Sequence, residues 1–193
     1  MALSITLHTH RTAAVDAIRA DRASAAVQIA GVVLFALLTA LGAQVRVYLW
    51  EVPITLQTLF VYGSGLFLGS RNGMLSMLLY LTLGLVFPVY AGEGYGVAYL
   101  LAAASTGYLI GMPLAAAVIG TLSKRWNTLS GSVLSLVAGS LTLFTAGVLW
   151  LHFAAGHATW AESIEIGWLR FVVFDAAKLI FVGLLYSGVR RLF

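Results

Sequence analysis

Six apolar stretches dominate this chain and constrain what it can fold into. A helix needs about 20 mostly apolar residues to cross the hydrocarbon core of a bilayer. Hydrophobic residues make up 61% of the chain and charged residues 9%, and a soluble domain of this size cannot bury that much apolar surface. We therefore predict an all-α membrane protein, a bundle of six transmembrane helices at about residues 27–45, 54–69, 73–90, 97–122, 131–153 and 166–189.

The basic residues predict the orientation of the bundle. Lys and Arg accumulate on the cytoplasmic side of membrane proteins, and six spans place both termini on one side. We predict that both termini are cytoplasmic, with residues 1–24 as a cytoplasmic arm and residues 25–193 as the transmembrane domain. The predicted cytoplasmic side carries Arg11, Arg19, Arg22, Arg71, Lys124, Arg125, Arg190 and Arg191.

Two charged residues interrupt the last apolar stretch. Asp175 and Lys178 lie three positions apart, so they share a helix face. Each costs about 2.5 to 3.5 kcal/mol at membrane depth. They either neutralise each other as a structural pair or form the polar floor of a ligand site. Counted from the outer end of the predicted helix, Asp175 is roughly 14 Å deep, near the midplane.

Further polar residues are candidates for the same site. Gln57 lies inside the second span, where an amide bonds to another helix or to a ligand. Arg170 is closer to the exterior, where it either extends to the headgroups or meets an anionic substrate. Residues 91–96 form a glycine-rich loop without the Lys-Ser/Thr of a phosphate-binding loop, so we interpret it as a flexible extracellular loop that can approach a ligand.

The sequence offers neither a catalytic constellation nor a source of energy. It contains no HExxH, GxSxG or P-loop motif and no cysteine. We predict that the chain is not an enzyme and binds no cofactor or metal. The net charge of +4 is distributed beside membrane spans, so it reflects topology and not nucleic-acid binding. Such a protein works passively or takes energy from a partner.

Several segments in consistent order and spacing resemble the BioY family, the biotin-binding subunits of energy-coupling-factor transporters. The resemblance covers about residues 27–189. At residues 103–107 the chain has Ala-Ala-Ser-Thr-Gly where the family usually carries Gly-Pro-Thr-Gly-Gly. The segments that carry the resemblance are Val52–Leu59, Gly65–Gly69, Pro88–Gly92, Gly107–Gly111 and Asp175-x-x-Lys178.

The resemblance implies a subunit that captures biotin outside a bacterial inner membrane and docks on a transmembrane coupling protein with two cytoplasmic ATPases, which hydrolyse ATP. Ala36 and Ala40 would contact the coupling protein, and residues 44–53 would serve as a gate. A homo-oligomer is also possible. The predicted substrate-binding residues are Asp175, Lys178, Gln57, Tyr90, Gly92, Arg46 and Arg170, with Phe60 and Trp168 as candidate aromatic lining.

Two other functions fit the same residues. The first is the same architecture with a different vitamin or small metabolite as ligand. The second is a stand-alone secondary carrier that uses Asp175 as its proton site, since an ionisable residue inside a membrane is a functional candidate by default. Ligand competition separates the first from biotin capture, and dependence of uptake on the proton gradient separates the second.

Overall fold

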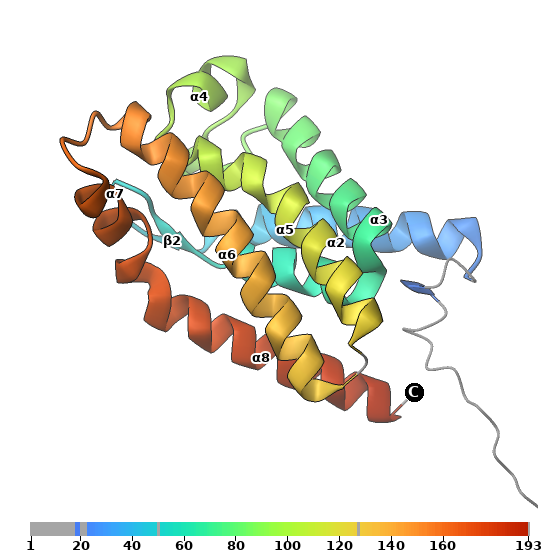
Figure 1. Cartoon of the computed structure of the whole chain (residues 1–193). Helices are drawn as coiled ribbons and strands as arrows, with labels where there is room; N and C mark the ends of the chain where they lie inside the picture. The colour runs from blue at the N-terminus through green and yellow to red at the C-terminus, as the bar shows by residue number, and fades with distance from the viewer. Residues whose placement is uncertain (1–17, 20–22, 50, 127, 193) are drawn as a thin grey trace, which may run out of the picture.

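A computed structural model describes residues 18–19, 23–49, 51–126 and 128–192. Five of its helices are long and apolar enough to cross a membrane. They are α2 (Ala25–Gln44), α3 (Gln57–Val86), α5 (Thr106–Arg125), α6 (Leu129–Ala154) and α8 (Val172–Leu192) (Figure 1). The shorter elements are β1 (Arg46–Val47), β2 (Ile54–Thr55), η1 (Ala91–Glu93), α4 (Gly96–Ala102), α7 (Trp160–Gly167) and η2 (Leu169–Phe171).

The helix α3 contains the second and third predicted spans. Gly69 interrupts it with φ 78° and ψ −177°, a left-handed conformation that glycine adopts without a steric penalty. Gly120 of α5 packs against this break, because a Cβ there would overlap the backbone of Ser70. The bundle therefore has six helical spans, as predicted, but the chain reverses at Gly69 and not at residues 70–72.

Two predicted spans differ from the apolar pattern. The fourth is divided at residues 103–105, which separate α4 from α5. The sixth begins at Val172, because the hydroxyl of Tyr108 donates a 2.6 Å hydrogen bond to the carbonyl oxygen of Gly167. The amide of Phe171 then bonds Trp168 in a tight 3₁₀ turn. Asp175 consequently lies in the first turn of α8, about 4.5 Å from its start, and not nine residues into the helix as predicted.

Small residues allow α5 to occupy the centre of the bundle, packed against both α3 and α6. A Cβ on Gly65 of α3 would overlap Ala116, and one on Gly139 of α6 would overlap Ile119. Glycines at helix contacts let backbones approach closely, which increases van der Waals packing where water supplies no driving force.

Basic residues gather at one end of the bundle. The guanidinium of Arg19 donates hydrogen bonds to the hydroxyls of Ser123, at 2.6 Å, and Tyr186. Arg71 and Lys124 line the same surface pocket as Arg19. The start of α2 and the end of α8 therefore lie at the same end, as an even number of spans requires. The β-hairpin, α4 and α7 lie at the opposite end (Figure 1).

Candidate ligand-binding site

A cavity of about 600 Å³, including its opening, lies between the hairpin and four of the long helices. Its wall combines one carboxylate, one ammonium and several hydroxyls with aliphatic and aromatic side chains. The lining residues are Val52, Pro53, Thr55, Gln57, Thr58, Ala91, Tyr99, Ser105, Tyr108, Leu109, Met112, Leu143, Phe144, Phe171, Phe174, Asp175 and Lys178.

Asp175 provides the negative charge of the cavity floor. Its carboxylate is only 4% exposed. Oδ1 accepts a 2.6 Å hydrogen bond from the hydroxyl of Tyr62, and Oδ2 accepts a 2.5 Å bond from the hydroxyl of Ser140. The positive end of the α8 dipole adds further stabilisation. An ionised carboxylate has about four acceptor positions, so Asp175 retains the capacity to accept hydrogen bonds from a ligand.

Lys178 provides the positive charge. Its Nζ donates to the backbone carbonyl oxygen of Thr55 at 2.7 Å and to the hydroxyl of Thr58 at 2.8 Å. An ammonium has three donors, so one remains for a ligand. Within the described part of the chain the ion pairs are His157–Glu51 and Arg170–Glu165. Asp175 and Lys178 therefore form no direct ion pair, and each is hydrogen-bonded to separate neutral groups.

Gln57 lines the cavity and also holds its wall together. Its amide oxygen accepts from the hydroxyl of Thr55 at 2.9 Å, and its amide nitrogen donates to the hydroxyl of Tyr80 at 2.6 Å. Tyr80 in turn donates to the carbonyl oxygen of Val89. The amide therefore connects the hairpin, α3 and the loop that follows α3.

Aromatic rings form one side of the cavity. Phe144 stacks on Trp168, with 6.0 Å between centroids and 5° between planes. The ring of Tyr108 packs edge-on against Phe144. Of the two candidate aromatics, Trp168 supports the lining from behind Phe144. Phe60 lies in a separate apolar pocket between α2, α3 and α8.

Four predicted site residues lie outside the lining of the cavity in this structure. Tyr90 is fully buried and donates to the carbonyl oxygen of Leu81 at 2.7 Å, although its ring stacks on Tyr99, which does line the cavity. Gly92 has φ 76° and faces the hydroxyl of Tyr48 in the hairpin.

The two predicted arginines are engaged at the surface. Arg46 lies in β1 and donates to the amide oxygen of Gln44 at 2.7 Å. Arg170 donates to the carboxylate of Glu165 at 2.9 Å. Asp175, Lys178 and Gln57 are thus the predicted residues that the fold brings together.

The structure adds residues that sequence reasoning missed. The hydroxyls of Tyr62 and Ser140 donate hydrogen bonds that orient Asp175. The carbonyl oxygen of Thr55 and the hydroxyl of Thr58 accept hydrogen bonds from Lys178. One available signal was the depth of Tyr62 within its span, since tyrosine favours the membrane interface and needs a polar partner elsewhere.

The small residues of α2 are turned toward the bundle. Ala36 is fully buried in the hydrophobic core, and Ala40 is half-buried against it. The methyl group of Ala36 is therefore inaccessible to another chain in this structure. Contact of these residues with a partner stays a prediction.

The fold and the cavity define a class of protein: a multi-pass membrane protein whose helices enclose a site for one small ligand. Residues 12–193 match the model of the BioY family. The chain belongs to this family of transporters, and it is not an enzyme.

Curated relatives cover most of the chain. It is 34% identical over 170 residues to "Probable biotin transporter BioY" of Lysinibacillus sphaericus, which covers 84% of this chain and 86% of the relative. It is also 34% identical over 160 residues to "Biotin transporter BioY" of Thermotoga maritima, covering 82% and 93% respectively.

A solved structure shares the fold. The S-component for biotin from an ECF-type ABC transporter, a crystal structure at 2.1 Å, superposes with a TM-score of 0.77. It is 24% identical in sequence, and the match covers 86% of this chain and 90% of that one. This similarity supports the six-helix architecture of the bundle.

Proposed function

We propose that this protein captures biotin at the outer face of a bacterial inner membrane, as the substrate-binding subunit of an energy-coupling-factor transporter. The observation that carries the proposal is the placement of Asp175 and Lys178 in one cavity without a direct ion pair. Membership of the BioY family supports it, because relatives at 34% identity are named biotin transporters.

The chemistry of the cavity suits the two parts of biotin. The ureido ring carries two N–H donors and one carbonyl acceptor. The Asp175 carboxylate can accept from the ureido nitrogens, and the free donor of Lys178 can bond the carbonyl oxygen. The thiophane ring and aliphatic tail require apolar walls, which Phe144, Phe171 and Leu143 provide.

Energy for uptake must come from outside the chain, since the sequence has no ATP-binding motif. We propose a transmembrane coupling subunit and two cytoplasmic ATPases as its partners. Among the long helices, α2 has the smallest share of buried residues, 17% of its most apolar window. Its exposed side is therefore our candidate for the coupling subunit, with the half-buried Ala40 at its edge.

The test is equilibrium binding of labelled biotin to the purified full chain in detergent. We expect binding that weakens sharply in Lys178→Ala, because the substitution removes the only ammonium in the cavity lining. Glu165→Gln is the control, since Glu165 lies in α7 outside the lining and bonds Arg170.

The results also decide between biotin and the other two functions. Absence of binding by the unmodified protein would refute the proposal, and competition with other vitamins would then identify the ligand. Biotin uptake that persists without ATPase partners and stops with a protonophore would favour a carrier that uses Asp175.

A further inference from the structure

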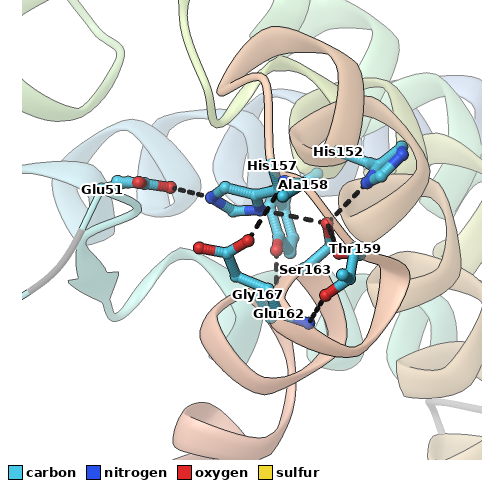
Figure 2. Close-up of polar contacts among 9 residues, drawn as sticks. Glu51, His152, His157, Ala158, Thr159, Glu162, Ser163 and Gly167 are labelled. Atoms are coloured by element: carbon cyan, nitrogen blue, oxygen red, sulfur yellow. Dashed lines mark hydrogen bonds and ion pairs between the residues drawn. The ribbon is translucent and has the colours of Figure 1, made fainter.

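A polar cluster joins the outer loops of the protein, away from the cavity floor. His157, in the loop between α6 and α7, contacts two other segments (Figure 2). Its Nε2 lies 3.0 Å from the carboxylate of Glu51, which precedes β2 by a few residues. Its Nδ1 lies 3.0 Å from the hydroxyl of Ser163 in α7. The His157 side chain is 5% exposed and that of Glu51 is 45% exposed.

Several hydrogen bonds and a ring contact hold the α7 side of this contact. His152 of α6 also bonds the Ser163 hydroxyl, at 2.8 Å, and stacks on Trp160 with 3.8 Å between centroids. The hydroxyl of Thr159 accepts from the amide of Glu162 and caps α7. The Glu162 carboxylate accepts from the backbone amide of Ala158, next to His157. These bonds fix the position of the imidazole.

The hairpin side of the contact leads directly to the cavity. Glu51 is followed by Val52 and Pro53, which line the cavity wall. The far end of the same hairpin is held from inside, because Lys178 donates to the carbonyl oxygen of Thr55. Residues 51–55 are thus attached at both ends: Glu51 contacts the α6–α7 loop, and Thr55 contacts α8.

We propose that Glu51 and His157 are positioning residues that form an outer latch, which holds the hairpin over the cavity and slows the release of the bound ligand. The inference rests on the proposed function for the identity of that ligand. It extends that function by assigning the retention of the substrate to one contact between two loops that are 106 residues apart in the sequence.

The latch forms when Nε2 of His157 carries a proton that it can donate to Glu51. The titratable groups around His157 are Glu51, His152 and Glu162. The hydroxyl of Ser163 has one proton for three acceptors in reach, the Nδ1 atoms of His152 and His157 and the carbonyl oxygen of Thr159. Neutral His157 with its proton on Nε2 donates to Glu51 and accepts from Ser163, while His152 donates to Ser163. A protonated His157 donates to both groups. The hydrogen bond to Glu51 therefore forms from the Nε2–H tautomer of neutral His157 and from protonated His157.

The test measures how fast labelled biotin leaves the loaded full chain during a chase. We expect Glu51→Gln and His157→Gln each to raise the release rate about threefold to tenfold, the effect of losing one partly exposed charge-assisted hydrogen bond. The double variant should release no faster than the faster single variant, because both remove the same contact. Association rates and the melting temperature should stay unchanged.

Glu165→Gln is the matched control. It removes a carboxylate from α7 that bonds Arg170 and does not bond the hairpin, so it should leave the release rate unchanged. Unchanged release in both single variants, or strictly multiplicative effects in the double variant, would overturn the latch. Loss of affinity that follows a falling melting temperature would also overturn it.

A second readout requires no ligand. Amide hydrogen exchange over residues 46–55 should become faster in both single variants of the free protein and remain unchanged in the control. If the unmodified protein binds no biotin, the proposed function fails, and this exchange measurement still decides whether the latch exists. If biotin binds but neither release nor exchange responds, only the latch is refuted.

Discussion

The sharpest prediction concerns Asp175→Asn, which changes the charge of the cavity floor at almost constant volume. Both carboxylate oxygens now accept from hydroxyls, of Tyr62 at 2.6 Å and of Ser140 at 2.5 Å. A hydroxyl both donates and accepts, so the hydroxyl that faces the new amide NH₂ can rotate and accept from it. The variant should therefore insert and fold.

We expect Asp175→Asn to lower biotin affinity more than it lowers the stability of the fold. A hydrogen bond to a charged group contributes about 1.5–3 kcal/mol, and one between neutral groups about 1 kcal/mol. The variant also replaces one acceptor atom with a donor, which faces the ureido N–H groups with the wrong polarity. Loss of one charge-assisted bond in a site that is 4% exposed corresponds to biotin affinity that is weaker by about 10-fold to 150-fold.

The assay is calorimetric or radioligand binding in detergent, with a melting curve of each variant as the control for folding. Ser135→Ala serves as a matched control, because it removes a buried hydroxyl that bonds only the backbone of its own helix, outside the cavity. Affinity within twofold of the unmodified protein, at an unchanged melting temperature, would refute direct contact between Asp175 and the ligand. A collapse of the melting temperature would show instead that the carboxylate is structural.

Three further predictions follow from packing and hydrogen bonds. Tyr62→Phe removes one donor to Asp175 and should weaken biotin binding by less than Asp175→Asn does, because Ser140 still orients the carboxylate; an effect as large as that of Asp175→Asn would contradict this. Ala36→Trp should prevent folding, since Ala36 is fully buried, whereas Leu41→Trp, at a position 65% exposed on α2, should preserve binding and reduce uptake with partner subunits. Gly120→Val should lower the melting temperature by several degrees or more, because a Cβ overlaps the α3 break.

The apolar pattern predicted the six spans because burial in lipid demands long apolar runs whatever the tertiary contacts are. Helix starts were harder to predict. The sequence gives no sign that Tyr108 bonds the carbonyl oxygen of Gly167, and this bond delays α8 until Val172. The position of Asp175 along its helix was therefore misjudged, although its presence in the site was predicted.

Some polar residues of the site could be predicted from the sequence and others could not. Asp175 and Lys178 were predicted because charge inside an apolar run is expensive and demands compensation. Tyr62 and Ser140 were missed because a hydroxyl in a helix can bond its own backbone, as Ser135 does here. Sequence alone also cannot show that Arg170, a predicted site residue, bonds Glu165 in this structure.

The break at Gly69 has a consequence for the surrounding membrane. The helical segment from Gln57 to the break rises only about 18 Å, against a hydrocarbon thickness of about 30 Å. The hairpin spans part of the remaining thickness. Lys178 bonds the carbonyl oxygen of Thr55, and the amide of Leu56, which follows the hairpin, bonds the carbonyl oxygen of Gly42. Such a hydrophobic mismatch favours a locally thinner bilayer. Lipid thickness thereby becomes a variable that acts on the entrance of the cavity.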